Sequence, residues 1–151
     1  MKSMSGLRQE VKRLCESQQF CVLATQSEGQ PYSNLVAFAE TDALRSLIFV
    51  TNRNTRKYAN AISNDKVAMM IDSRTNQPSD FNTALAVTAL GTVEEVAVSE
   101  RDAIISIYLS KHPYLAEFTN MPDQALMRVK VSEYVIAHFD KVQVIHINDL
   151  G

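Results

Sequence analysis

The sequence predicts a mostly β fold of the α+β class, a barrel of six to seven mainly antiparallel strands with two to three peripheral helices. Its first basis is a series of short apolar or alternating segments separated by turns that contain Gly, Pro, Asn or Asp. Its second basis is that the helical segments do not recur between strands at the regular intervals that parallel crossovers require. Both observations favour an antiparallel barrel over a doubly wound sheet.

Length and composition are those of one ordinary globular domain, and we expect a single domain over residues 1–151. Hydrophobic residues make up 46% and charged residues 21%, and the formal net charge is −2. Such a chain has no overall basic field, so we expect no nucleic-acid partner and no binding to acidic membranes.

The chain is expected to be cytoplasmic. Its charged N-terminal segment lacks the apolar core of a signal peptide, and no apolar run approaches the roughly 20 residues of a membrane helix. Cys15 and Cys21 do not form a Cys-x-x-Cys pair and lie on different predicted elements. We therefore expect both to be reduced thiols.

The first half of the chain contains two helical segments among its strands. Leu7, Val11 and Leu14 recur at helical spacing, which predicts a short amphipathic helix. A second helix is predicted over about residues 55–63. The strands predicted in this half occupy residues 20–25, 32–40, 46–52 and 66–73.

The second half begins with a long predicted strand over residues 83–96, in which Gly91 indicates a bulge or bend where the barrel turns. Ser99 is expected to cap a helix, with Asp102 completing an imperfect capping box. Pro113 then ends that helix. The apolar stripe of the helix is Ile104, Ile105, Tyr108 and Leu109. The remaining segments are a further helical turn at residues 114–118 and strands at residues 125–139 and 142–147.

Polar side chains gather where the third strand meets the next helix, in the segment TNRNTRK. Arg56 and Lys57 lie in the first helical turn, where the helix dipole makes each cation unfavourable by roughly 0.3–1 kcal/mol. Free N–H groups at a helix start accept an anion, to which Thr55 adds a hydroxyl. Thr51 and Asn52 can donate to the group that carries a phosphate. The opposing interpretation, solvated cations beside a simple N-cap, is equally open from these residues alone.

The strand order, together with FVTNRNTRKYANAISNDKVAMMID, resembles the flavin-binding split-barrel family typified by pyridoxamine 5′-phosphate oxidase. Members carry an apolar or aromatic residue before Thr-Asn at the strand end, then a Ser/Thr-Arg-Lys helix start, a helix, a short turn and another strand. The similarity extends from about Phe20 to Val96. It implies a split β-barrel that holds FMN at the interface of a homodimer.

The resemblance also implies the cofactor contacts. Thr55, Arg56 and Lys57 would hold the FMN phosphate, whereas the second strand would run beside the isoalloxazine ring. Ser33 stands where the oxidases usually have Arg, so one contact with the phosphate or the ribityl chain is expected to be missing. The implied cofactor-binding residues are Ser33, Asn34, Leu35, Val36, Val50, Thr51, Asn52, Thr55, Arg56 and Lys57.

The substrate site of the oxidase is not matched. Phe38 stands where the oxidase has a Lys, and the last third of the chain contains no Arg-x-His. We therefore expect no oxidation of vitamin B6. The first hypothesis is an FMN-dependent oxidoreductase that acts on an unidentified small molecule, with no catalytic side chain named because flavin carries the electron chemistry. The alternatives are a non-enzymatic FMN-binding or electron-transfer protein with its electron donor, and a binding module without flavin.

No metal site is expected, because His112, His138 and His146 lack metal-ligand spacing. Some relatives of the fold handle heme, but no axial ligand can be identified. We expect a homodimer with shared FMN sites, in which the partner covers an exposed apolar surface. The residues expected on that surface are Val36, Phe38 and Val50. The polar loop at residues 73–82 either lines a neighbouring subunit's flavin or forms a hairpin tip.

Overall fold

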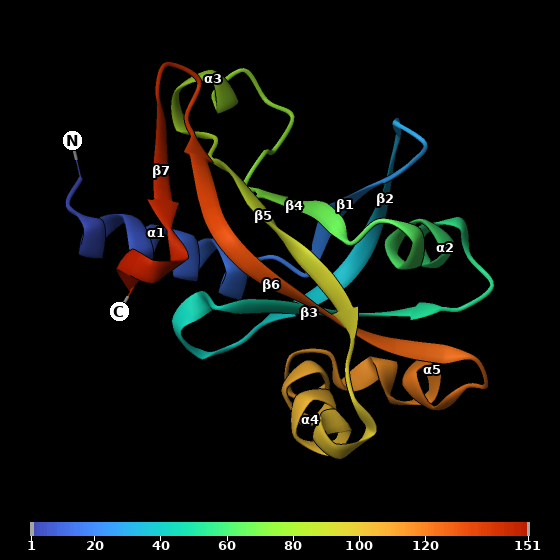
Figure 1. Ribbon diagram of the computed structural model, residues 1–151. Helices are drawn as coiled ribbons and strands as arrows, with labels where there is room; N and C mark the ends of the chain where they lie inside the picture. Colours follow the sequence, from blue (N-terminus) through green and yellow to red (C-terminus); the bar gives the residue numbers. More distant parts are fainter. Residues whose placement is uncertain (1, 151) are drawn as a thin grey trace.

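The computed structural model describes residues 2–150, which form a closed six-stranded antiparallel barrel with a seventh strand at its side (Figure 1). The strands follow the order β3-β2-β1-β4-β5-β6-β7, and a further pairing of β3 with β6 closes the barrel. The predicted fold class is confirmed. The strands are β1 Phe20–Ser27, β2 Gln30–Glu40, β3 Ser46–Asn52, β4 Lys66–Asp72, β5 Ala86–Glu95, β6 Gln124–Ala137 and β7 Val142–His146.

The described residues contain five α-helices, more than the two or three expected. They are α1 Met4–Ser17, α2 Arg56–Ser63, α3 Asp80–Thr83, α4 Arg101–Lys111 and α5 Ala116–Asn120. Helices as short as α3 and α5 leave no periodic pattern in a sequence. The expected cap at Ser99 is wrong, because Val98–Glu100 forms a 3₁₀ turn and α4 begins after Glu100. No helix within residues 2–150 is long and apolar enough to cross a membrane.

Two apolar cores lie on opposite sides of the barrel wall. The barrel interior and α1 share the larger core, in which Cys15 and Cys21 are buried free thiols, as expected. The second core lies outside, where α4 and α5 pack below β3 and β6 (Figure 1). Tyr108 of α4 is at its centre, with Ile48 and Leu126 from the strands.

The bend predicted at Gly91 is confirmed, because the register between β5 and β6 shifts between Leu90 and Gly91. A Cβ atom at Gly91 would lie 2.2 Å from the carbonyl oxygen of Lys130. The absence of a side chain therefore allows the two backbones to approach closely. The first half of β6 can then pair with β3, and its second half pairs with β7.

Strands β2 and β3 pair over only three residue pairs, from Phe38–Phe49 to Glu40–Leu47. Residues 30–37 of β2 pair with β1, and β3 pairs with β6 along its whole length. The two strands therefore diverge, and we call residues 35–37 together with residues 50–52 the β2–β3 fork. Backbone groups along diverging edges are available to a ligand.

The expectation that Val36, Phe38 and Val50 form an exposed apolar surface is wrong. Their exposed fractions are 5%, 0% and 6%, because the barrel interior encloses Val36 and Phe38 and the outer core covers Val50. Exposed apolar side chains lie instead on the outer face of β1 and β2, where Phe20 is 61% and Leu35 is 66% exposed.

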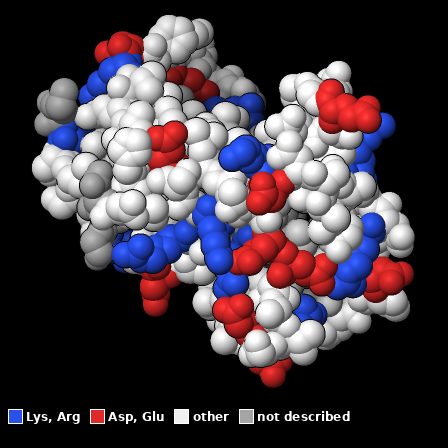
Figure 2. Space-filling view, viewed as in Figure 1, with Lys and Arg blue, Asp and Glu red and all other residues white. Residues whose placement is uncertain are grey.

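A row of residues on this outer face runs in register across six strands. This outer-face row consists of Leu35, Val22, Met70, Thr88, Val135 and Val144. Five of its six members are apolar, which is unusual for a surface that faces water. Charged side chains of both signs are interspersed over the face shown in Figure 2, without a broad basic patch on that face.

Replacing Gly91 with Ala should lower the free energy of unfolding by about 1–3 kcal/mol, because the new methyl group overlaps the Lys130 carbonyl. Urea unfolding measures the change. Gly6→Ala is the control, since the nearest atom to its new methyl group is the Ser3 hydroxyl oxygen at 3.3 Å. Equal stability of Gly91→Ala and the wild type would contradict a steric requirement for glycine.

Candidate functional site

An open cavity of about 330 Å³ lies at the β2–β3 fork. Both diverging strands, the start of α2 and the α4–α5 region contribute to its wall. Its volume falls within the range of small-molecule sites. The lining residues are Leu35, Val36, Ala37, Val50, Thr51, Asn52, Thr55, Lys57, Tyr108, Leu115 and Phe118. Polar residues from β3 and α2 therefore share one cavity with apolar residues from β2, α4 and the segment after it.

The turn between β3 and α2 is ordered by its own side chains. The Thr55 hydroxyl donates to the Asn52 carbonyl at 2.7 Å and accepts from the Tyr58 N–H at 3.4 Å, which makes Thr55 the N-cap of α2. The Asn52 side-chain oxygen accepts from the Asn54 N–H at 2.8 Å. Because the single proton of the Thr55 hydroxyl is already donated, an anion here would depend on backbone N–H groups and on cations.

The two neighbouring cations occupy different positions. Lys57 is the only cation that the described part of the chain contributes to the cavity lining, and burial lowers the pKa of its ammonium group. Arg56 is exposed, and its guanidinium carbon lies over the ring of Tyr32, 4.9 Å from the centroid. A desolvated cation gains most from an anionic partner, so Lys57 favours an anion in the cavity.

Two side chains of the α4 region hold it against β2. The Tyr108 hydroxyl donates to the Ala37 carbonyl at 3.3 Å, and the Nε2 atom of His112 lies 2.6 Å from the Phe38 carbonyl oxygen. Since a carbonyl only accepts, Nε2 must carry the proton. Burial raises the pKa of Tyr108 to about 12 and lowers the pKa of His112. Both side chains are therefore neutral at pH 7.

The structure brings seven of the ten predicted site residues together at the cavity and places three elsewhere. Ser33 is exposed on the outer face of β2, opposite Ala24. Asn34 faces the interior opposite Leu23, and its side-chain oxygen is buried with no hydrogen-bond partner among the described residues. Arg56 contacts Tyr32, as described above.

Four lining residues were not predicted as site residues: Ala37, Tyr108, Leu115 and Phe118. Tyr108 was recognised only as part of an apolar helical stripe. The stripe signals burial, but it does not say which strands the helix will pack against. The sequence carries no separate signal for the contribution of residues 115 and 118.

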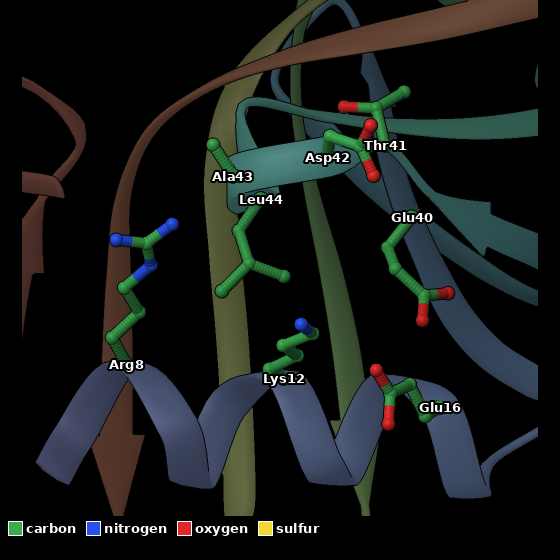
Figure 3. A pocket seen from close by; sticks show the side chains of 8 residues that line it. All are labelled: Arg8, Lys12, Glu16, Glu40, Thr41, Asp42, Ala43 and Leu44. Carbon is green, nitrogen blue, oxygen red and sulfur yellow. The ribbon is translucent and has the colours of Figure 1, made fainter. Parts of the chain in front are cut away.

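A second cavity of about 160 Å³ lies between α1 and the turn after β2 (Figure 3). Arg8 and Lys12 extend from α1 toward that turn, and Glu40 lies at its other side (Figure 3). Glu40 already accepts a hydrogen bond from the Lys111 ammonium at 3.0 Å. The lining of this second cavity mixes both signs of charge and includes none of the predicted site residues, so we assign no ligand to the cavity.

The remaining histidines pair with carboxylates. His138 lies 3.1 Å from Glu10, and His146 lies 3.4 Å from Glu133. Within residues 2–150, no group of three or more His, Cys, Asp and Glu side chains is arranged to hold a metal ion.

Comparison with known proteins places this geometry in a family. The family model "Pyridoxamine 5′-phosphate oxidase" matches residues 7–136. No curated protein gives a significant match. A heme-binding protein from Mycobacterium smegmatis has a similar structure, with a TM-score of 0.85 and 13% identity over 99% of this chain and 61% of that chain. This chain thus spans about three fifths of the length of that protein.

Two further solved structures are similar. A protein related to general stress protein 26, of the pyridoxinephosphate oxidase family, from Clostridium acetobutylicum has a TM-score of 0.74 and 18% identity, covering 96% of this chain and 97% of that one. A FAD-binding protein from Mesorhizobium loti has a TM-score of 0.66 and 18% identity, covering 85% and 91%. At these identities the structures show a shared fold.

The buried His112 should make stability depend on pH. Its pKa is lowered from the ordinary value of 6.5 in the folded state, so the unfolded chain binds more protons as the pH falls through that value. The free energy of unfolding should therefore decrease below about pH 6.5. His112→Gln keeps an N–H donor for the Phe38 carbonyl and cannot titrate, so it should lose less stability. Urea unfolding at several pH values tests this, and identical pH profiles for the two proteins would contradict it.

Proposed function

Because the chain belongs to the pyridoxamine 5′-phosphate oxidase family, whose model matches residues 7–136, we propose that the cavity at the β2–β3 fork binds FMN. We further propose an FMN-dependent oxidoreductase that acts on an unidentified small molecule. One observation carries this proposal: a single cavity joins a cationic helix start to an apolar region bordered by two diverging strand edges.

The polar end suits a phosphate. Lys57 is a partly desolvated cation in the lining, and the first N–H groups of α2 have no partner within the helix. A phosphate group would satisfy both, since helix starts attract anions. Arg56, in the same turn, adds donors in a planar fork.

The other end suits a flat heteroaromatic ring. Leu35, Leu115 and Phe118 offer apolar contacts, and the fork offers backbone N–H and C=O groups to polar ring atoms. FMN, when bound, supplies one- and two-electron transfer. The residues of this chain would bind FMN, orient it and shield it from water. Tyr108, whose pKa is raised to about 12, keeps its proton and holds α4 in place as a wall.

Heme is less well suited to this cavity. None of the described residues in the lining is His, Cys or Met, and the Tyr108 hydroxyl donates a hydrogen bond to the Ala37 carbonyl. The typical axial ligands of heme are those residue types and Tyr. A non-enzymatic flavoprotein that passes electrons to a partner is the second candidate, favoured by the high exposure of Leu35 at the cavity.

A second copy of the chain is the partner we propose for the outer-face row. Leu35 belongs both to that row and to the cavity lining, so a copy that covers the row would also reach the cavity. The loop at residues 73–82 borders the same face, because Arg74 lines a small cavity together with Phe20 and Leu35. An isologous dimer would place this loop near the partner's site and give two equivalent FMN sites.

The protein should bind FMN more tightly than riboflavin, and Arg56→Ala should weaken FMN binding by about 1.5–3 kcal/mol, the contribution of a charge-assisted hydrogen bond. Fluorescence titration measures both ligands. Arg13→Ala, which removes an exposed arginine from α1, is the matched control and should bind FMN as the wild type does. Equal affinities of the wild type for FMN and riboflavin would refute the phosphate site.

Light scattering should detect a homodimer that holds two FMN molecules, and dilution should release FMN as the dimer dissociates. Phe20→Glu should split the dimer, because it places a charge beside the outer-face row. Val98→Glu is the control, since Val98 is 91% exposed in the turn before α4. A Phe20→Glu monomer that retains stoichiometric FMN would contradict shared sites.

A further inference from the structure

Helix α2 is held by the β1–β2 hairpin at two points. Arg56 lies over the ring of Tyr32 at 4.9 Å, and the Asn60 side-chain nitrogen donates to the Thr25 hydroxyl at 3.1 Å. Arg56 and Asn60 are four residues apart and therefore lie on one face of the helix. Thr25 and Tyr32 are direct partners across the hairpin. A pair of helix residues thus meets a pair of facing strand residues.

From this arrangement we infer that Tyr32 is a positioning residue for the phosphate site: its ring holds the Arg56 guanidinium beside the first turn of α2. The inference rests on the proposed binding of FMN. It adds to that proposal a residue that the sequence motif does not contain, on a strand far from the motif in sequence.

An aromatic ring is a suitable support for an arginine that must bind a ligand. The ring attracts the face of the guanidinium, whereas the N–H donors project in its plane and stay available. Arg53 shows the contrasting case, because its guanidinium donates to the Glu95 carboxylate at 2.6 Å. Among the described residues, Arg56 is not paired with a carboxylate, so its donors are not consumed in this way.

The buried hydrogen bond keeps this contact in place. Asn60 and Thr25 are 6% and 3% exposed, and a buried donor that lost its acceptor would be costly. Because α2 has only eight residues, it depends on such tertiary contacts for its position. The hydrogen bond between Asn60 and Thr25 fixes the helix against the hairpin. The Arg56 side chain is thereby kept near the Tyr32 ring. An arm ordered before binding loses less entropy when the ligand arrives.

The test compares the affinities of FMN and riboflavin in variants of Tyr32. Tyr32→Leu should weaken FMN binding about threefold to tenfold, the scale of a cation–π contact at an exposed site together with lost preorganisation. Riboflavin has no phosphate, so its affinity should not change. Tyr32→Phe keeps the ring and should bind both ligands as the wild type does.

A double-mutant cycle separates positioning from general stability. In Arg56→Ala, the further change Tyr32→Leu should have no effect on FMN binding, because the guanidinium is already absent. Thermal unfolding of each apo-protein shows whether the fold is intact.

The outcomes are distinct. An unchanged ratio of FMN to riboflavin affinity in Tyr32→Leu would overturn the inference, whether or not both affinities fall. Additive effects in the cycle would also overturn it. A wild type that binds FMN and riboflavin equally, or an Arg56→Ala variant that binds FMN normally, would overturn the proposed phosphate site itself. Those two measurements leave Tyr32 untouched, so the two failures can be told apart.

Discussion

The pairing of β6 with both β5 and β3 is the constraint on which the cavity depends. The closure is possible because Gly91 lets β5 and β6 approach and shift register, which turns the first half of β6 toward β3. β3 pairs with β6 over seven residue pairs but with β2 over only three, so its pairing with β2 ends at Phe49. The segment between β5 and β6 contains α4 and α5, which pack below β3 and β6 and supply the outer wall (Figure 1). The closure of the barrel, the β2–β3 fork and the cavity wall therefore meet at β3.

The charge of the cavity lining comes from one cation among the described residues. Among the described residues, Lys57 is the only cation in the cavity lining, and it lies with Thr55 at the end formed by β3 and α2. Phe38, at the position where the oxidase has a Lys, is fully buried with the Lys111 ammonium over its ring at 3.9 Å. A cavity with one cation suits a ligand with a single phosphate, and its apolar end suits an uncharged partner molecule.

Local patterns predicted much of the fold, and they also predicted residues that lie together at one end of the candidate cavity. Strand alternation, the turn residues and Gly91 are short-range signals, so the strands and the bend were predicted correctly. The run from Thr51 to Lys57 is contiguous, and five of its seven residues were predicted as cofactor contacts; four of them line the cavity. Packing between distant elements could not be predicted from these local patterns. Alternation separates two faces of a strand, but it does not say which face α4 will cover, so the burial of Val50 and the exposure of Leu35 were missed.

The different positions of the Arg56 and Lys57 side chains also depend on tertiary structure. The sequence places Arg56 and Lys57 side by side in a helical turn, and in the structure Lys57 lines the cavity whereas Arg56 lies over the ring of Tyr32. Consecutive residues on a helix face different directions, and the elements around the helix decide what each side chain contacts.

Amide chemical shifts measured while FMN or riboflavin is added test the central claim most directly, because they locate each end of the ligand. FMN should shift the amides of Arg56 and Lys57, and riboflavin should leave those two in place. Both ligands should shift the amides of Leu35 and Val50 at the fork. Shifts confined to the cavity beside α1, or no difference between the two ligands at the start of α2, would contradict the claim.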